Sequence, residues 1–165
     1  FFTEQMNEEV SRRLQLEEQL HSALEQGELE IYYQPQVDLN SLQIMGAEAL
    51  LRWHSPVLGE VSPDEFIPIS EQTGLISSIG QFVLREALAM SKSIRHRLEP
   101  KFRIAVNLSL RQLRENDFTD SLLNLLRELE IQGNQLELEI TESILLDGNI
   151  QIKQALEAIS KLGIH

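Results

Sequence analysis

Cysteine is absent from the chain, which therefore has no disulfide framework, no thiol nucleophile and no cysteine-based zinc site. Basic residues are few, because 14 lysines and arginines stand against 26 aspartates and glutamates, for a formal net charge of -12. This acidity excludes sequence-independent binding to duplex nucleic acid, which requires a basic face. No apolar run reaches the length of a membrane span. We expect a cytoplasmic domain, with any membrane anchor of the parent protein outside this chain.

The chain has 165 residues, of which 42% are hydrophobic, enough for one domain with a core. Apolar patterns with strand-like alternation predict strands at 29–35, 44–53, 102–110 and 135–143. Helical patterns are found at 3–26, 62–74, 76–98, 116–130 and 149–163. The short segment QVDLNSLQ predicts an antiparallel hairpin between the first two strands, since a parallel crossover needs about a dozen residues or more. The later alternation of strand and helix predicts a parallel sheet covered by helices.

The helix predicted at 3–26 carries an apolar stripe of Val10, Leu14, Leu20 and Leu24 and is followed by Gly27, a common helix stop. Two interpretations fit this pattern. The helix either packs on its own domain or connects that domain to one upstream.

Carboxylates and an amide interrupt the strands in a regular way. Glu48 lies in the middle of the apolar run MGAEALLRW, and alternation gives each of the three later strands one apolar face and one face with Glu48, Asn107 or Glu139. An open sheet between two helical layers would have two apolar faces, whereas the interior of a barrel can hold a polar site. Oxygen donors of this kind suit Mg²⁺ or Mn²⁺. The alternative is an internal ion pair, for example between Glu48 and Arg52.

Five blocks of the sequence resemble the EAL domain family, which hydrolyses the bacterial second messenger cyclic di-GMP. They are YYQP at 32–35, AEALLRW at 47–53, GEVSPDEFIPISEQTGLI at 59–76, AVNLS at 105–109 and LELEITES at 136–143. The resemblance runs from about residue 20 to the last residue. It implies a (β/α)8 TIM-like barrel with an antiparallel first strand pair, of which this chain contains only the first half. Residues 27–165 would form that half. Residues 1–26 would be a connector helix from an upstream domain, which by the same resemblance would be a GGDEF domain.

The resemblance also implies roles for single residues. Glu48 would be a catalytic metal ligand, with Asn107 and Glu139 completing this part of a two-metal Mg²⁺ or Mn²⁺ site. Glu142 would hold a mobile loop near the metals. In the family the next strand, just past His165, carries a pair of aspartates, and the remaining ligands would lie there and on later strands.

Three further residues would contact the substrate by the same resemblance. Arg52 would bind a phosphate of cyclic di-GMP, and Gln34 and Leu50 would line the nucleotide cleft. The implied reaction is hydrolysis of cyclic di-GMP to linear pGpG by the parent protein, while this chain alone would be inactive. Its incomplete barrel predicts a homo-oligomer or another partner that covers the open side. The alternative function is that of a catalytically inactive receptor for cyclic di-GMP, although every motif residue within the chain is intact.

Overall fold

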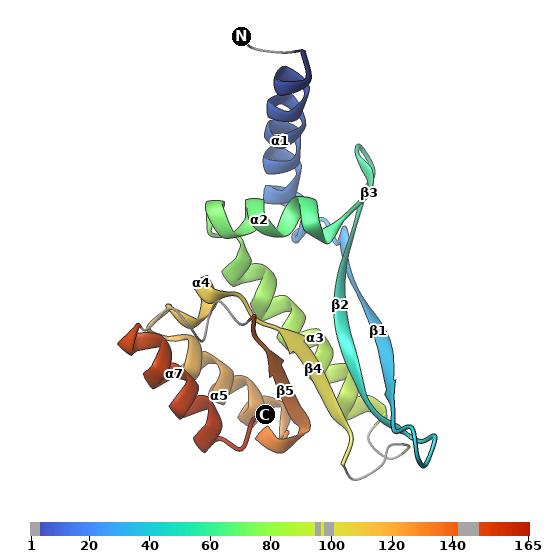
Figure 1. The fold of residues 1–165 in the computed structure, drawn as a ribbon, viewed down its shortest axis with the longest axis vertical. Helices are drawn as coiled ribbons and strands as arrows, with labels where there is room; N and C mark the ends of the chain where they lie inside the picture. The colour runs from blue at the N-terminus through green and yellow to red at the C-terminus, as the bar shows by residue number, and fades with distance from the viewer. Residues whose placement is uncertain (1–3, 95–96, 98–100, 142–148) are drawn as a thin grey trace. The chain divides into compact units, whose positions relative to one another are not determined.

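The computed structural model describes residues 4–94, 97, 101–141 and 149–165. Two compact units make up the chain, and each has its own packing (Figure 1). Residues 1–30 and 51–79 form the first unit, and residues 31–50 and 80–165 form the second. Among the described residues, no helix has both the length and the apolar character that a membrane crossing requires.

Helix α1, Glu4–Ala23, lies in the first unit and buries the apolar side chains Leu16, Leu20 and Ala23. Its Arg12 forms an ion pair of 3.2 Å with Glu65 of the neighbouring helix α2. The helix predicted at 3–26 is therefore confirmed, although it ends at Ala23. Its packing on α2 agrees with the first of the two interpretations, a helix that packs on its own domain.

Helix α2, Pro63–Thr73, begins and ends as the sequence predicts. Pro63 occupies the first turn, where the missing N–H has no helical partner in any case. Gly74 follows the helix with a φ of 87°, a left-handed conformation that glycine adopts without steric cost.

The core of the first unit is built around Trp53. This residue lies near the end of strand β2, Ile44–Ser55, which pairs antiparallel with the short strand β3, Gly59–Val61. Its ring is fully buried and meets Phe66 edge to face, with ring centroids 5.6 Å apart. Its Nε1 donates a hydrogen bond of 2.9 Å to Oε2 of the buried Glu28. One carboxylate thus satisfies the only polar atom of a fully buried indole.

The second unit contains a mixed sheet with the strand order β1-β2-β4-β5. Strand β1, Leu29–Val37, and β2 form the predicted antiparallel hairpin, whose turn is closed by the Asp38 N–H donating to the Gln43 carbonyl. Strand β4, Arg103–Asn107, pairs parallel with β2 on one side and with β5, Leu136–Glu139, on the other. The described elements are therefore α/β with an antiparallel first pair, as predicted, and they represent only part of a (β/α)8 barrel.

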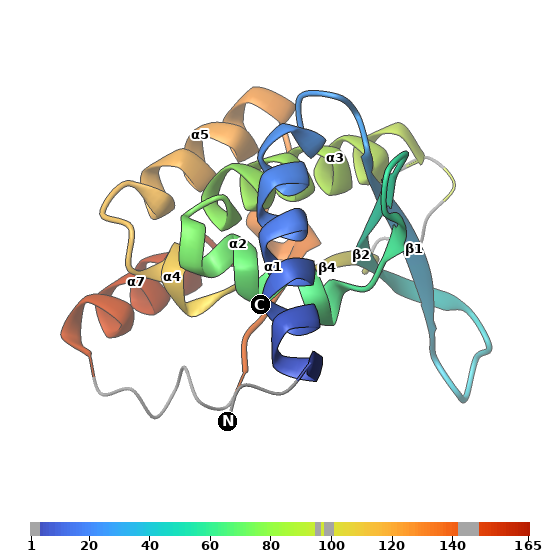
Figure 2. The ribbon, with the colours of Figure 1, turned by 90° about the horizontal axis from the view of Figure 1, so that it is seen from above.

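The helices of the second unit follow the strands in alternation. In the view from above, α3 and α5 lie on the same side of β4 (Figure 2). The apolar face of the strands is buried, with Ile104, Val106 and Leu136 at most 2% exposed. The helical elements are α3 (Ile76–Ile94), α4 (Leu110–Leu113), α5 (Phe118–Leu129), the 3-10 helix η2 (Gly133–Gln135) and α7 (Ile150–Lys161).

The strand predicted at 102–110 is too long at its carboxyl end. It stops at Asn107, because Ser109 caps the short helix α4 and turns the chain away from the sheet. Strand β3, α4 and η2 were not predicted. The strand predicted at 135–143 is also too long, since β5 begins at Leu136 and ends at Glu139; residues 142 and 143 of that prediction lie outside the described residues.

The sheet ladder continues beyond β5. The N–H of His165 donates to the Leu136 carbonyl, and the N–H of Leu138 donates to the His165 carbonyl. In a parallel pair, the N–H and the carbonyl of one residue bond to two residues that are two positions apart on the neighbouring strand, which is the pattern seen here. His165 is thus hydrogen-bonded to β5 in a parallel arrangement.

The Trp53 core allows a direct test of its buried hydrogen bond. We expect Glu28→Met to lower the free energy of unfolding by about 1–3 kcal/mol, because the buried indole N–H would lose its acceptor. Trp53 is the only tryptophan of the chain, so its fluorescence during urea denaturation reports the unfolding of this unit.

Glu28→Gln is the matched control, since its amide oxygen can still accept the indole N–H. We expect it to cost less than about 1 kcal/mol. An equal loss of stability in the two variants would show that the hydrogen-bond acceptor is not what matters at this position.

Candidate functional site

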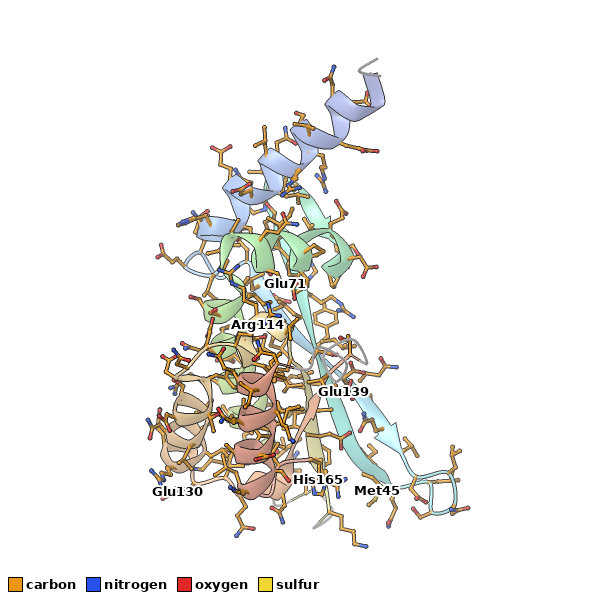
Figure 3. All side chains as sticks on the ribbon, turned by 60° about the vertical axis from the view of Figure 1, so that its left-hand side comes forward. Met45, Glu71, Arg114, Glu130, Glu139 and His165 are labelled. Atoms are coloured by element: carbon orange, nitrogen blue, oxygen red, sulfur yellow. The ribbon has the colours of Figure 1, made fainter. Side chains whose placement is uncertain are left out.

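Two parallel pairings bring three predicted site residues to the same end of the sheet. In the β2–β4 pairing Glu48 lies opposite Ala105, and in the β4–β5 pairing Asn107 lies opposite Glu139. Glu139 marks the carboxyl end of β5 in Figure 3, whereas Met45, near the start of β2, lies toward the other end of the sheet. The carboxyl ends of parallel strands are where functional groups of such folds gather.

Glu48 and Asn107 are in direct contact. The Asn107 Nδ2 donates a hydrogen bond of 2.8 Å to Oε1 of Glu48. The half-buried Glu48 side chain reaches this partner from the position opposite Ala105. Because Ala105 has only a methyl group, it leaves space above the strand for the longer side chains on either side.

Glu139 adds a second carboxylate with a raised pKa. Partial burial is the largest cause, followed by the negative charges of Glu48 and then Glu137, each of which disfavours ionisation of Glu139. Arg103 lies 3.7 Å from the Glu137 carboxylate and forms an ion pair with it. The carboxylates of Glu48 and Glu139 therefore repel each other, and a cation bound between them would relieve that repulsion.

These three side chains fit part of a site for a hard cation. Two carboxylates and an amide oxygen are the donors that Mg²⁺ and Mn²⁺ prefer. Within the described ranges, no group of three or more His, Cys, Asp or Glu side chains is placed to hold a metal ion. Glu48, Asn107 and Glu139 are three donors, fewer than the roughly six ligands that these cations take, and would supply only part of a coordination shell.

The other predicted site residues lie on β1 and β2 or outside the described residues. Gln34 is exposed on β1, and Leu50 is half-buried on β2, on the same face as Glu48 by alternation. Arg52 belongs to the first unit, where its Nη1 donates a hydrogen bond of 2.9 Å to the Leu51 carbonyl. Glu142 lies outside the described residues.

Sequence reasoning missed two residues near the site. Glu137 affects the pKa of Glu139, and its position two residues earlier on the same strand was a signal that both share a face. Gln112 forms a capping box with Ser109 at the end of β4. A serine followed three residues later by glutamine is the sequence signature of that motif.

Comparison with known proteins identifies the family. A family model described as the EAL domain matches residues 17–165. MucR of Pseudomonas aeruginosa, a bifunctional diguanylate cyclase/cyclic di-GMP phosphodiesterase, is 37% identical over 164 residues, which are 99% of this chain and 24% of MucR. The cyclic di-GMP phosphodiesterase PdeR of Escherichia coli is 33% identical over 162 residues, 98% of this chain and 24% of PdeR. The chain thus spans about a quarter of the length of these two relatives.

Solved structures agree in fold. The PaMucR phosphodiesterase in complex with c-di-GMP has a TM-score of 0.85 and 37% identity, covering 91% of this chain and 61% of that one. The EAL enzyme Bd1971 in its cAMP-bound form also has a TM-score of 0.85, with 35% identity over 94% of this chain and 44% of that one. The family match begins inside α1, and the predicted domain boundary at residue 27 stays a prediction. The chain belongs to the EAL domain family, and several of its relatives, MucR and PdeR among them, are named as cyclic di-GMP phosphodiesterases.

Proposed function

We propose that the parent protein of this chain hydrolyses one phosphodiester bond of cyclic di-GMP and releases linear pGpG. The observation that supports this most directly is the grouping of Glu48, near the middle of β2, with Asn107 and Glu139 at the carboxyl ends of β4 and β5. Relatives more than 30% identical across almost the whole chain are named as phosphodiesterases of this messenger.

In this proposal Glu48, Asn107 and Glu139 hold Mg²⁺ or Mn²⁺, with the remaining ligands of a two-metal site beyond His165. Bound divalent cations supply Lewis acidity toward the phosphoryl oxygen and make a water molecule more acidic. The two glutamates contribute negative charge, and a half turn of the Asn107 amide would direct its oxygen toward the cation in place of its N–H. Glu142 would hold the adjacent loop.

The remaining predicted residues bind and orient the substrate. The Arg52 guanidinium would bind a phosphate of cyclic di-GMP, for which its planar set of donors is well suited. Gln34 and Leu50 would line the cleft that holds the nucleotide. The chain carries a net charge of -12, so the cations and Arg52 would together provide the local positive field that an anionic dinucleotide requires.

The setting of the reaction is part of the same proposal. We place it in the cytoplasm, downstream of a GGDEF or sensor domain to which residues 1–26 connect, and in a homo-oligomer. MucR, which is named as both a diguanylate cyclase and a phosphodiesterase, supports the tandem arrangement.

The first prediction concerns the reaction itself. The parent polypeptide, incubated with cyclic di-GMP and Mg²⁺, is expected to release pGpG, and a chelator should abolish the release. We expect Glu48→Gln to lower kcat at least about 100-fold, since even outer-shell partners of metal sites are worth about 10- to 100-fold. Products are separated by chromatography.

Glu157→Gln, an exposed substitution on α7 with the same loss of charge, serves as the control and should retain activity. Tight binding of cyclic di-GMP without turnover in the wild-type parent would contradict the enzyme and favour the receptor alternative.

The 165-residue chain alone is expected to release no pGpG under the same conditions, because the remaining metal ligands would be missing. Turnover by the purified chain, sensitive to chelator, would refute the need for residues beyond His165.

Glu139→Gln separates the electrostatic role of this residue from its role as a ligand. An acid whose pKa is raised in the folded state contributes stability below its ordinary pKa of 4.5, and this stability is lost as the pH rises through the raised pKa. Without added cation, we therefore expect Glu139→Gln to be more stable than the wild type at about pH 8. Solvent screening keeps the gain below about 1 kcal/mol, and the difference should vanish near pH 4.

Excess Mn²⁺ should reverse the order at the higher pH, because a cation that binds only the folded wild type stabilises it. Circular dichroism during urea denaturation measures the stability difference with and without Mn²⁺, and Glu157→Gln is again the control. A variant that is less stable than the wild type without cation would contradict the predicted repulsion between Glu48 and Glu139.

A further inference from the structure

The turn that follows Asn107 is held by a buried polar side chain. Gln112, on the short helix α4, is only 4% exposed. Its Oε1 accepts a hydrogen bond of 3.1 Å from the N–H of Ser109, and its own N–H donates to the Ser109 Oγ at 3.4 Å. These two bonds form a capping box that begins two residues after Asn107.

Helix α3 leaves space for the Gln112 amide at one position. A Cβ atom placed on Gly80 would lie 1.8 Å from Nε2 of Gln112, far inside van der Waals contact. The amide therefore occupies the space directly over Gly80. Packing against the α3 backbone on one side and bonding to the Ser109 N–H on the other restrict Gln112 to one orientation.

The other side of Asn107 is held by the sheet. The N–H of Leu108 donates a hydrogen bond of 2.9 Å to the carbonyl of Glu139, and Asn107 pairs directly with Glu139 in the parallel register. The backbone at 107–109 thus has a sheet partner on β5 and a cap partner in Gln112. From this fixed point the Asn107 side chain reaches Glu48.

We propose that Gln112 is a positioning residue, which holds the end of β4 so that the Asn107 amide stays directed at the Glu48 carboxylate. The inference rests on the proposed function in so far as Asn107 is taken to be a metal ligand. Gln112 itself contacts neither metal nor substrate in this account. It acts through Ser109 and the strand end, and Gly80 provides the space in which it can do so.

Gln112→Met tests the role of the amide oxygen. Methionine has a similar length and volume but offers no good acceptor to the Ser109 N–H, so the turn would lose one of its two cap bonds. In the parent polypeptide we expect Mn²⁺ affinity, measured by calorimetry, to fall about 3- to 10-fold, somewhat less than for a direct partner of a metal ligand. The side-chain amide signal of Asn107 in the nuclear magnetic resonance spectrum, assigned with Asn107→Ala, should shift or broaden.

A double-mutant cycle shows whether the effect passes through Asn107. In an Asn107→Ala background, Gln112→Met should cause no further loss of Mn²⁺ affinity. An equal loss in both backgrounds would overturn the proposal. Leu125→Ala, a buried substitution on α5, is the control for lost stability alone, and it should leave the Asn107 amide signal in place.

The failure of the proposed function can be distinguished from the failure of this inference. If the wild-type parent neither binds Mn²⁺ nor turns over cyclic di-GMP, the metal role of the site is wrong. The Asn107 amide signal and the hydrogen exchange of the Leu108 amide then still decide the positioning role. Gln112→Met should speed that exchange more than Leu125→Ala does, and an unchanged signal with unchanged exchange would refute the inference.

Discussion

The parallel pairing of β4 with both β2 and β5 is the constraint on which the rest of the site depends. It brings residues far apart in the sequence, Glu48, Asn107 and Glu139, to one end of the sheet. A shift of a single residue in either pairing would turn the side chains of one strand to the opposite face. Buried Ile104, Val106 and their neighbours resist such a shift, because it would expose them. The apolar core of the second unit thereby determines the geometry of its polar face.

That polar face carries an electrostatic cost in the absence of a cation. Two carboxylates share one end of the sheet, and the pKa of Glu139 is raised partly by the charge of Glu48. Arg103, at the start of β4, forms its ion pair with Glu137. Proteins retain such like-charge arrangements mostly at functional sites, where a bound ion relieves them. An acidic chain can in this way present a favourable surface to an anionic substrate only after it has bound cations.

The sequence was sufficient to predict which residues share the polar face, but not where the strands end. Alternation along a strand needs only the local pattern, and it predicts that Glu48, Asn107 and Glu139 lie on the polar faces of their strands. The end of β4 depends instead on competition between the sheet and the cap formed by Ser109 and Gln112. The apolar pattern of FRIAVNLSL continues through that point, so hydrophobicity alone predicts a longer strand. The space that Gly80 leaves for Gln112 arises from tertiary packing, which no local pattern contains.

The division of the chain into two units also bears on the proposed chemistry, because the boundary falls within β2 between Leu50 and Leu51. Glu48 is held by the sheet and the Asn107 contact of the second unit. Arg52 is followed by Trp53, whose ring is buried in the first unit. The next residue is His54, whose N–H donates a hydrogen bond of 2.9 Å to the Glu28 carbonyl. The proposed metal ligand and the proposed phosphate ligand thus lie on one continuous strand but are fixed by different cores. A substitution that loosens the Trp53 core should therefore act first on the contacts proposed between Arg52 and substrate, while the proposed cation ligands keep their own support.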